Sequence, residues 1–346
     1  ETGMSRKLYD AAYALIGSVR GGLASATVIG CGGFAALSGS SVASALTMGK
    51  VSLGEMERFD YDPRLAAGSV AAGGTLGILI PPSTGFVIYA ILAQESIGRL
   101  FLAGVLPGLL LLGMFVLTIS ILCWFNPKLA PKGPSTTLRQ KAFGVAGAAP
   151  IGAVILLTIG GIYGGLFSPV EAAAVGAGLV IIWGFATRSL GLAMLWSACK
   201  DSVVTTSTVM LILISAHMIN PFLALSHIPQ AFGAFLTALD MSALGVLGLI
   251  LLCYMVLGCF LEGFAMLVLT MPIFYPVITA LGIDPIRFGV LVVLTLEMGL
   301  ISPPVGINVF IVKSVAPNVP LGQIFLGVIP FWIAMFVTLL LLVAFP

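Results

Sequence analysis

The sequence predicts an all-α polytopic membrane protein made of two inverted repeats, each with a re-entrant hairpin and a broken helix. Composition indicates the membrane: 59% of the 346 residues are hydrophobic and only 8% are charged, whereas soluble domains carry about 25% charged residues. Apolar runs such as residues 105–125 and 325–345 are long enough to cross a hydrocarbon core of roughly 30 Å. An internal repeat and two Pro-Pro breaks supply the rest of the prediction.

The chain repeats itself at an offset of about 222 residues. Four landmarks recur in the same order: LTM at 46–48 and 269–271, Asp-Pro at 62–63 and 284–285, GILIPP at 77–82 and GLISPP at 299–304, and GRLFLAGVLP at 98–107 and GQIFLGVIP at 322–330. The counterparts of residues 145–222 would fall before residue 1. Either the first repeat never had them or they are absent from this chain; we favour absence, of roughly 75–85 residues.

Basic residues orient the two repeats. The stretch 126–143 carries four basic residues and no acidic one, which places it in the cytoplasm because basic loops stay on that side. Three crossings then follow, at 145–163, 169–187 and 191–214. Since three is odd, the second repeat enters the membrane from the opposite side, so the repeats are inverted.

These constraints give an order of elements. The first repeat spans 1–125, with a hairpin at 20–50 whose tip is SGSS (38–41) and a broken helix at 66–94; a cytoplasmic linker follows at 126–143. The second repeat spans 144–346 and contains scaffold helices at 144–214, a periplasmic arm at 215–240, a hairpin at 241–281 with its tip at GCFLEG (258–263), a broken helix at 286–314 and a last span at 321–345.

Each Pro-Pro break frees backbone groups at mid-membrane depth. A proline has no N–H and leaves the carbonyl one turn earlier without a partner, and such carbonyls are good ligands for Na⁺. The helix that starts after each break directs its positive N-terminal end at the same place, which suits a carboxylate. Paired discontinuous helices in inverted halves are typical of midplane sites in secondary transporters. Two proline kinks without function are the alternative, which the matched positions disfavour.

Four polar side chains near the breaks are candidates for supporting roles. Glu297 lies in apolar sequence, where carboxylates are functional candidates; it either ligates an ion or orders the unwound backbone. Its repeat counterpart is Thr75, so a symmetric pair of carboxylates is excluded. Asn308 either contacts the substrate or caps the second half-helix, and the hydroxyls of Thr75 and Ser302 either ligate or bond to backbone.

Common enzyme motifs do not occur in the sequence. It contains no GxxxxGK[ST], HExxH or GxSxG, and no histidine is placed to activate Ser38 in the stretch ALSGS. His217 and His227 lack zinc-site spacing, and the five cysteines include no CxxC pair. We therefore predict that the protein is not an enzyme, carries no organic cofactor and does not bind nucleic acid.

Three stretches together resemble a known family. GGLASATVIGCGGFAALSGSSVASA (21–45), GTLGILIPPSTGFVIYA (74–90) and EMGLISPPVGINVFIVKSVAP (297–317) are similar to the large membrane subunit of the tripartite ATP-independent periplasmic (TRAP) transporters. The resemblance implies an elevator-type fold of the ion-transporter superfamily, in which a transport domain with two hairpins moves against a fixed scaffold. It also implies Na⁺-coupled import, across the bacterial inner membrane, of an organic acid such as a C4-dicarboxylate or sialic acid.

The resemblance further implies partners and a location for the site. A periplasmic binding protein would deliver the substrate, and a small four-helix membrane subunit would accompany the large one. In such folds a hairpin tip and the unwound helix of the same half form each Na⁺ site. The first site would use Ser38, Gly39, Ser40, Ser41, Gly77, Ile80 and Pro81. The second would use Gly258, Leu261, Glu262, Gly263, Met298, Gly299, Ser302 and Pro303. The substrate would lie near Ser41, Ser83, Thr84, Gly306 and Asn308, supported by Thr75 and Glu297.

Two other functions stay open at this point. A stand-alone cation-coupled carboxylate carrier or exchanger of the same fold would need no binding protein. An assembly scaffold with no transport of its own would show no dependence on cations.

Overall fold

The computed structural model describes residues 3–133, 137–226, 231 and 241–345. These residues form helices and connecting turns, and their one pairing of strand type is an isolated bridge between Arg20 and Lys132. Within them, six helices are long and apolar enough to cross a membrane, or seven if one bent pair is counted as a span. The prediction of an all-α polytopic membrane protein is confirmed.

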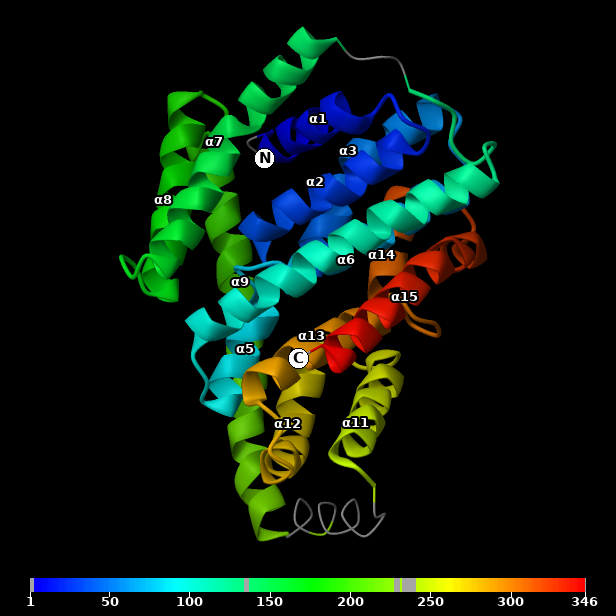
Figure 1. Ribbon diagram of the computed structural model, residues 1–346. Helices are drawn as coiled ribbons and strands as arrows, with labels where there is room; N and C mark the ends of the chain where they lie inside the picture. The colour runs from blue at the N-terminus through cyan, green and yellow to red at the C-terminus, as the bar shows by residue number, and fades with distance from the viewer. Residues whose placement is uncertain (1–2, 134–136, 227–230, 232–240, 346) are drawn as a thin grey trace.

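The helices follow the chain from blue to red in Figure 1. Residues 3–133 form α1 (Met4–Ile16), α2 (Gly22–Ser38), α3 (Ser41–Arg58), α4 (Pro63–Leu79), α5 (Thr84–Ala93) and α6 (Ile97–Phe125). Next come α7 (Leu138–Tyr163), α8 (Pro169–Ala186) and α9 (Leu192–Leu225). The last group is α11 (Ala243–Gly258), α12 (Gly263–Ala280), α13 (Pro285–Leu300), α14 (Ile307–Val315) and α15 (Leu321–Ala344).

Three helices run further than the sequence analysis predicts. Helix α3 continues past Lys50 to Arg58, and it ends only where the backbone turns left-handed at Asp60. Helix α7 begins inside the predicted linker, at a capping box formed by Thr137 and Gln140. Helix α9 continues through residues 215–225 of the predicted periplasmic arm. Residues 227–230 and 232–240 of that arm lie outside the described residues.

Equivalent local sequences start the two central helices. Asp62 caps α4 by accepting a 2.8 Å hydrogen bond from the Arg64 amide, and Asp284 caps α13 by accepting one of 2.8 Å from the Arg287 amide. In both helices a proline follows the aspartate, at the position where its missing N–H costs nothing. The repeated Asp-Pro landmarks are therefore helix starts.

The core lies along α4 and α13. Every residue from 65 to 77 in α4 and from 288 to 300 in α13 is buried, as expected of helices that are apolar on all sides. Helices α2 and α3 pack against α4, and α11 and α12 pack against α13. Helix α15 also packs against α4, so closely that a Cβ on Gly327 would lie 2.0 Å from the Arg64 carbonyl oxygen.

The two halves of the chain interlock at the short helices that follow the breaks. Helix α14 packs against α3 and α4, and α5 packs against α12 and α13. Each short helix therefore lies against the hairpin of the other half.

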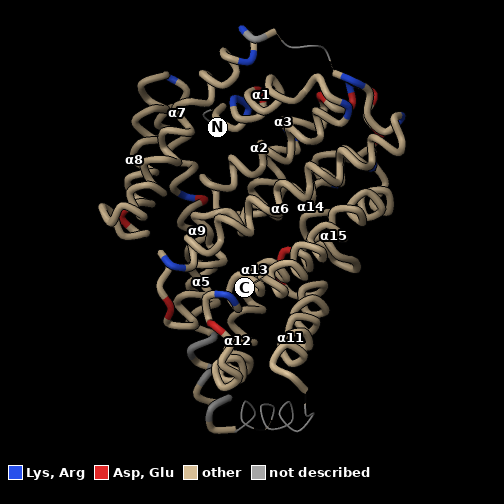
Figure 2. Tube along the Cα trace, viewed as in Figure 1, with Lys and Arg blue, Asp and Glu red and all other residues tan. Residues whose placement is uncertain are grey.

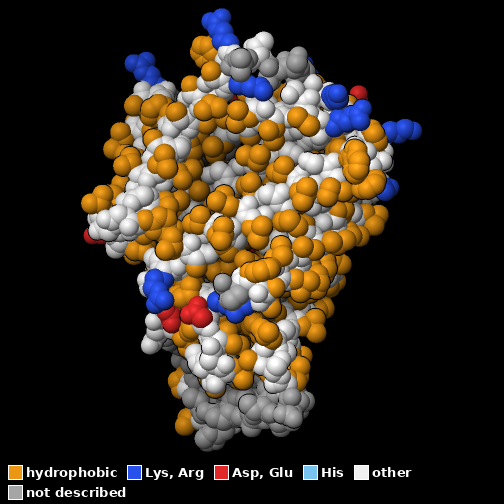
Figure 3. All heavy atoms as spheres, in the orientation of Figure 1, with side chains coloured by type: hydrophobic (Ala, Val, Ile, Leu, Met, Phe, Trp, Pro, Cys, Tyr) orange, Lys and Arg blue, Asp and Glu red, His pale blue; other side chains and the backbone are white. Residues whose placement is uncertain are grey.

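Charge and hydrophobicity divide the surface. Figure 2 shows most Lys and Arg residues at one end of the trace, around α1, the start of α7 and the segment after α6. Figure 3 shows hydrophobic side chains covering most of the rest of the visible face. This distribution fits a membrane protein whose basic end faces the cytoplasm.

Candidate functional site

The first hairpin tip lies against the first break. Gly39 ends α2 in the left-handed conformation, with φ 58°, and Thr84 Oγ1 donates a 2.6 Å hydrogen bond to the Gly39 carbonyl. A Cβ on Gly77 would lie 2.4 Å from the Ser40 carbonyl oxygen. Only glycine allows the tip and the break to approach this closely. The structure thus brings these predicted residues of the first ion site together.

The two prolines of this break act on different carbonyls. Pro81 cannot donate to the Gly77 carbonyl four residues earlier, and Pro82 cannot donate to that of Ile78. The Ser83 hydroxyl donates to the Ile78 carbonyl instead. The carbonyl that loses its helical donor to Pro81 thus belongs to Gly77, the residue in close contact with the hairpin tip.

The second hairpin meets the second break by the same kind of contact. A Cβ on Gly299 would lie 2.6 Å from the Gly258 backbone, and Gly299 is the repeat counterpart of Gly77. Pro303 has no N–H for the Gly299 carbonyl, which accepts a 3.0 Å hydrogen bond from the Ser302 amide. Met298 and Gly263, also predicted for this site, are buried, whereas Pro303 is exposed.

The Ser302 hydroxyl makes hydrogen bonds within the protein. Ser302 Oγ donates a 2.7 Å hydrogen bond to the Met298 carbonyl and accepts one of 2.9 Å from Trp332 Nε1 on α15. Of the two roles predicted for this hydroxyl, the structure shows the bond to backbone. The sequence analysis missed Trp332, because nothing in its local sequence distinguishes it from other apolar residues of a long span.

The Glu262 side chain caps a helix. Glu262 is exposed, and its Oε2 accepts hydrogen bonds of 2.9 Å from the Phe264 amide and 3.1 Å from the Ala265 amide at the start of α12. Capping accounts for this carboxylate. Contributions of the Glu262 and Leu261 backbones to an ion site remain predictions.

Glu297 contacts the opposite half of the chain. It is 1% exposed, and its Oε1 accepts a 2.9 Å hydrogen bond from Ser41 Oγ in the first turn of α3. Its Oε2 has no partner, and no basic side chain that the structure describes lies within ion-pairing distance of it. Glu297 therefore braces the first hairpin rather than the unwound backbone beside it, and this pairing was not foreseen from the sequence.

Asn308 is buried without hydrogen-bond partners. It is 0% exposed, and neither Oδ1 nor Nδ2 has a partner. Its predicted alternative role as a helix cap is wrong: Gly306, in the left-handed conformation with φ 61°, is the N-cap of α14, and no side chain caps this helix. The capping role fails because Asn308 lies inside the helix, after its N-cap.

Two of the other predicted side chains, Thr75 and Ser38, already have hydrogen-bond partners. Thr75 Oγ1 donates a 2.6 Å hydrogen bond to the Ala72 carbonyl within α4, so its hydroxyl bonds to backbone. Ser38 Oγ lies 3.1 Å from Ser44 Oγ. Ile80 is partly buried and Pro81 is buried at the first break.

The predicted substrate residues divide between the two breaks. Ser83 and Thr84 lie at the first break and Ser41 at the first tip, whereas Gly306 and Asn308 lie at the second break. Helix α14 packs against α3, and the Ser41–Glu297 hydrogen bond connects the first tip to the helix that precedes the second break.

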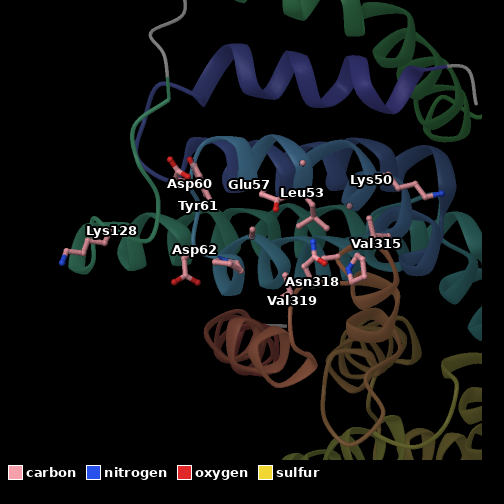
Figure 4. A pocket seen from close by; sticks show the side chains of 16 residues that line it. Lys50, Leu53, Glu57, Asp60, Tyr61, Asp62, Lys128, Val315, Asn318 and Val319 are labelled. Atoms are coloured by element: carbon pink, nitrogen blue, oxygen red, sulfur yellow. The ribbon is translucent and has the colours of Figure 1, made fainter.

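A cavity of about 660 Å³ opens elsewhere, at the basic end of the molecule. Figure 4 shows it between the end of α3, the start of α4 and the loop after α14, with Lys50 and Lys128 at its two sides. None of the predicted site residues lines it. A smaller cavity of about 210 Å³ lies between Ser302, Pro303 and Trp332.

The fold and the two tip-to-break contacts define a class: a polytopic membrane transporter with discontinuous helices. The family model for the tripartite ATP-independent periplasmic transporter, DctM component, matches residues 1–346. This chain belongs to that family and is a large membrane subunit of the TRAP transporter type. The resemblance drawn from the three sequence stretches is confirmed, as is the prediction that the protein is not an enzyme.

Curated relatives agree with this assignment, and a solved structure shares the fold. The C4-dicarboxylate TRAP transporter large permease protein DctM of Pseudomonas aeruginosa is 37% identical, over 99% of this chain and 80% of its own length. The isethionate TRAP transporter permease protein DctMQ of Oleidesulfovibrio alaskensis is 33% identical, over 99% of this chain and 54% of its own length. The crystal structure of the Alcanivorax borkumensis YdaH transporter, at 14% identity, shares the fold with a TM-score of 0.67, over 99% of this chain and 84% of that one.

Proposed function

We propose that this large subunit imports an organic acid across the bacterial inner membrane, driven by Na⁺, by an elevator movement of its two hairpins and broken helices. The observation that carries the proposal is the pair of matched contacts between hairpin tips and breaks. Gly77 meets Ser40, and its counterpart Gly299 meets Gly258, each at a distance that only glycine permits. Two sites of similar construction, each formed by the backbone of a hairpin tip and of a broken helix, are suited to ions and substrate.

Backbone chemistry supports Na⁺ as the coupling ion. Each break removes the i+4 donor of a carbonyl in a residue that touches a hairpin tip: Gly77 at the first break, and Gly299 at the second, where the Ser302 amide donates to that carbonyl instead. Transporters with discontinuous helices use unwound backbone carbonyls to coordinate Na⁺. The sites need no acidic side chain for this, which agrees with the capping role of Glu262.

Helix starts support an anionic substrate. Helices α3, α5 and α14 have their N-caps at Ser40, Ser83 and Gly306, at the end of a tip or a break. The N-terminal end of a helix attracts negative charge. The two relatives described above are named for a C4-dicarboxylate and for isethionate, which are both anions. Sialic acid and similar carboxylates belong to the same class of substrate.

Two partners complete the proposed assembly: a small four-helix membrane subunit and a periplasmic binding protein that delivers the substrate. The family is described as tripartite. Helices α7, α8 and α9 support a membrane partner, because only 17%, 11% and 6% of their most apolar segments are buried within this chain. Such faces lie against lipid or against another membrane subunit.

The test is uptake into proteoliposomes that contain the large subunit and its small partner. An inward Na⁺ gradient, a periplasmic binding protein and a panel of labelled organic acids are each added or withheld. Uptake that needs both the gradient and the binding protein supports the proposal and identifies the substrate. Uptake that needs Na⁺ alone indicates a stand-alone carrier, and uptake indifferent to every cation contradicts the coupling.

A further inference from the structure

Two basic residues, Arg20 and Lys132, lie opposite each other at the basic end of the protein. Arg20 lies between α1 and α2 and Lys132 lies in the segment after α6, and they are paired in an isolated antiparallel bridge. Residues opposed in this way have Cα atoms roughly 4.5–5.5 Å apart and side chains on the same face. Both are exposed, and neither forms an ion pair with a described acidic residue. Since like charges directly opposite each other are destabilising, this basic pair is suited to an anion that both side chains can contact.

Each member of the basic pair is followed by a glycine in close contact with another segment. A Cβ on Gly133 would lie 2.2 Å from the Gly17 carbonyl oxygen, and a Cβ on Gly21 would lie 2.8 Å from Cys123 Sγ, near the end of α6. Gly21 also has a left-handed φ of 74°, which residues with a Cβ rarely adopt. These contacts hold the basic pair beside the last turn of α6.

An exposed apolar stripe runs along α6 toward the basic pair. Its members recur at intervals of three, four and eight residues, so they lie on one face of the helix. They are Leu102, Leu106, Leu109, Leu117, Ile121 and Trp124, all exposed. The stripe rises about 33 Å from its first residue to its last, which matches a hydrocarbon core of roughly 30 Å. Figure 3 shows hydrophobic side chains along the course that α6 takes in Figure 1.

The composition of this stripe favours lipid over a protein partner. Interfaces between membrane helices are rich in Gly, Ala, Ser and Thr, whereas the stripe consists of Leu, Ile and Trp. Where it ends, Trp124 and Phe125 are 76% and 77% exposed, with ring centroids 5.1 Å apart. Exposed aromatic side chains of this kind gather at the level of the lipid headgroups. The basic pair, beside the same turn of α6, therefore lies at headgroup level.

We propose that Arg20 and Lys132 bind the phosphate of an anionic phospholipid in the cytoplasmic leaflet, with the acyl chains along the second half of the stripe. Arginine binds phosphate oxygens through two parallel N–H groups, and lysine binds them as a point charge. Basic residues at the cytoplasmic surface of a membrane attract anionic lipids. This lipid site is independent of the ion and substrate sites proposed above.

The test is the binding of fluorescent phosphatidylglycerol to the purified large subunit in detergent. Phosphatidylcholine with the same acyl chains is the comparison, so that the difference between the two dissociation constants reports on the headgroup. A basic residue near an anionic membrane surface contributes about fivefold in affinity. We therefore expect the double variant Arg20→Gln, Lys132→Gln to bind phosphatidylglycerol about 25-fold more weakly, near the level of phosphatidylcholine.

The double variant Arg139→Gln, Lys141→Gln is the matched control. It removes two charges from the same basic stretch, 126–143, but in the first turn of α7. We expect this control to bind phosphatidylglycerol as the wild type does. Equal losses in the two double variants would overturn the site, because general attraction to the basic end would then account for the binding.

Two measurements on the wild type keep the test decisive if the first double variant folds poorly. Excess inorganic phosphate should displace no more lipid than sodium chloride of equal ionic strength does, since phosphate has no acyl chain. Full displacement by phosphate would reveal a site for free anions and overturn the proposal. Binding is then repeated with the small membrane partner present: retained binding supports the lipid site, and loss of binding would show that the partner covers the stripe instead.

Discussion

The Ser41 hydroxyl donates a 2.9 Å hydrogen bond to Glu297 Oε1, joining two residues 256 positions apart in the chain. Both residues are 1% exposed. The bond ties the first turn of the first hairpin's second helix to the broken helix of the other half, at the level of both breaks. Any movement of the first tip relative to α13 therefore has to break this contact, whereas a joint movement of the two keeps it.

Replacing Ser41 by Ala should destabilise the protein by about 1–3 kcal/mol, because the buried carboxylate then loses its hydrogen-bond donor. Ser52→Ala is the matched control, since Ser52 lies on the same helix, is 0% exposed and bonds only to the Met48 carbonyl one turn earlier. Unfolding in detergent, followed for both variants, checks the difference. Equal losses of stability in the two variants would show that the hydrogen bond to Glu297 contributes no more than an ordinary buried hydroxyl.

Gly299→Val should abolish Na⁺-driven uptake while the protein still inserts into the membrane. A Cβ on Gly299 would lie 2.6 Å from the Gly258 backbone, so the second hairpin would have to move away from the break. Gly113→Val on α6 is the control, because a Cβ placed there meets no described atom within 4 Å beyond the neighbouring backbone of its own helix. Uptake by G299V at the wild-type rate would show that the contact between Gly299 and Gly258 is not part of the ion site.

Asn308→Leu should raise stability and abolish transport. Leucine fills a similar volume without two buried polar atoms that lack partners, and each such atom costs about 1–3 kcal/mol. Thr270→Val serves as the contrast. The Thr270 hydroxyl is bonded to Tyr254 Oη, so its removal should lower stability. Thermal unfolding and uptake are measured on the same preparations. A less stable N308L, or one that still transports, would show that Asn308 does not serve a ligand.

Thr84→Val should weaken Na⁺ binding about fivefold, because it removes the hydrogen bond that ties the first break to the Gly39 carbonyl. Hydrogen bonds within membrane proteins contribute about 0.6 kcal/mol on average and about 1.7 kcal/mol at most. Thr118→Val on α6 is the control, since that hydroxyl bonds only to the Met114 carbonyl. The measurement is the Na⁺ concentration that gives half-maximal uptake. An equal shift in both variants would contradict a specific role for Thr84.

Much of the architecture could be predicted from the sequence because its causes are local. Low charge and long apolar runs indicate spanning helices, and Asp-Pro starts the helices at Pro63 and Pro285. The Pro-Pro pairs interrupt helices because proline has no N–H. Helix ends were less predictable: α3 and α9 continue through residues that also suit a loop, since their neighbours are good helix formers.

The roles of polar side chains could not be predicted in the same way. In the sequence, Glu262 and Glu297 are both acidic residues with mostly apolar neighbours. In the structure, Glu262 is exposed and caps α12, whereas Glu297 is buried against Ser41. Burial and partner depend on how distant helices pack. Hydropathy does not encode this packing, because α4 and α13 are apolar on every face.

The sequence by itself thus determined the membrane class, the family and the positions of the two breaks, because each follows from composition or from the covalent chemistry of adjacent residues. Tertiary structure alone decided that Gly77 meets Ser40, that Gly299 meets Gly258 and that Ser41 holds Glu297. The physical reason is that these contacts arise between helices brought together by burial, and glycine and serine carry no signal of their distant partners.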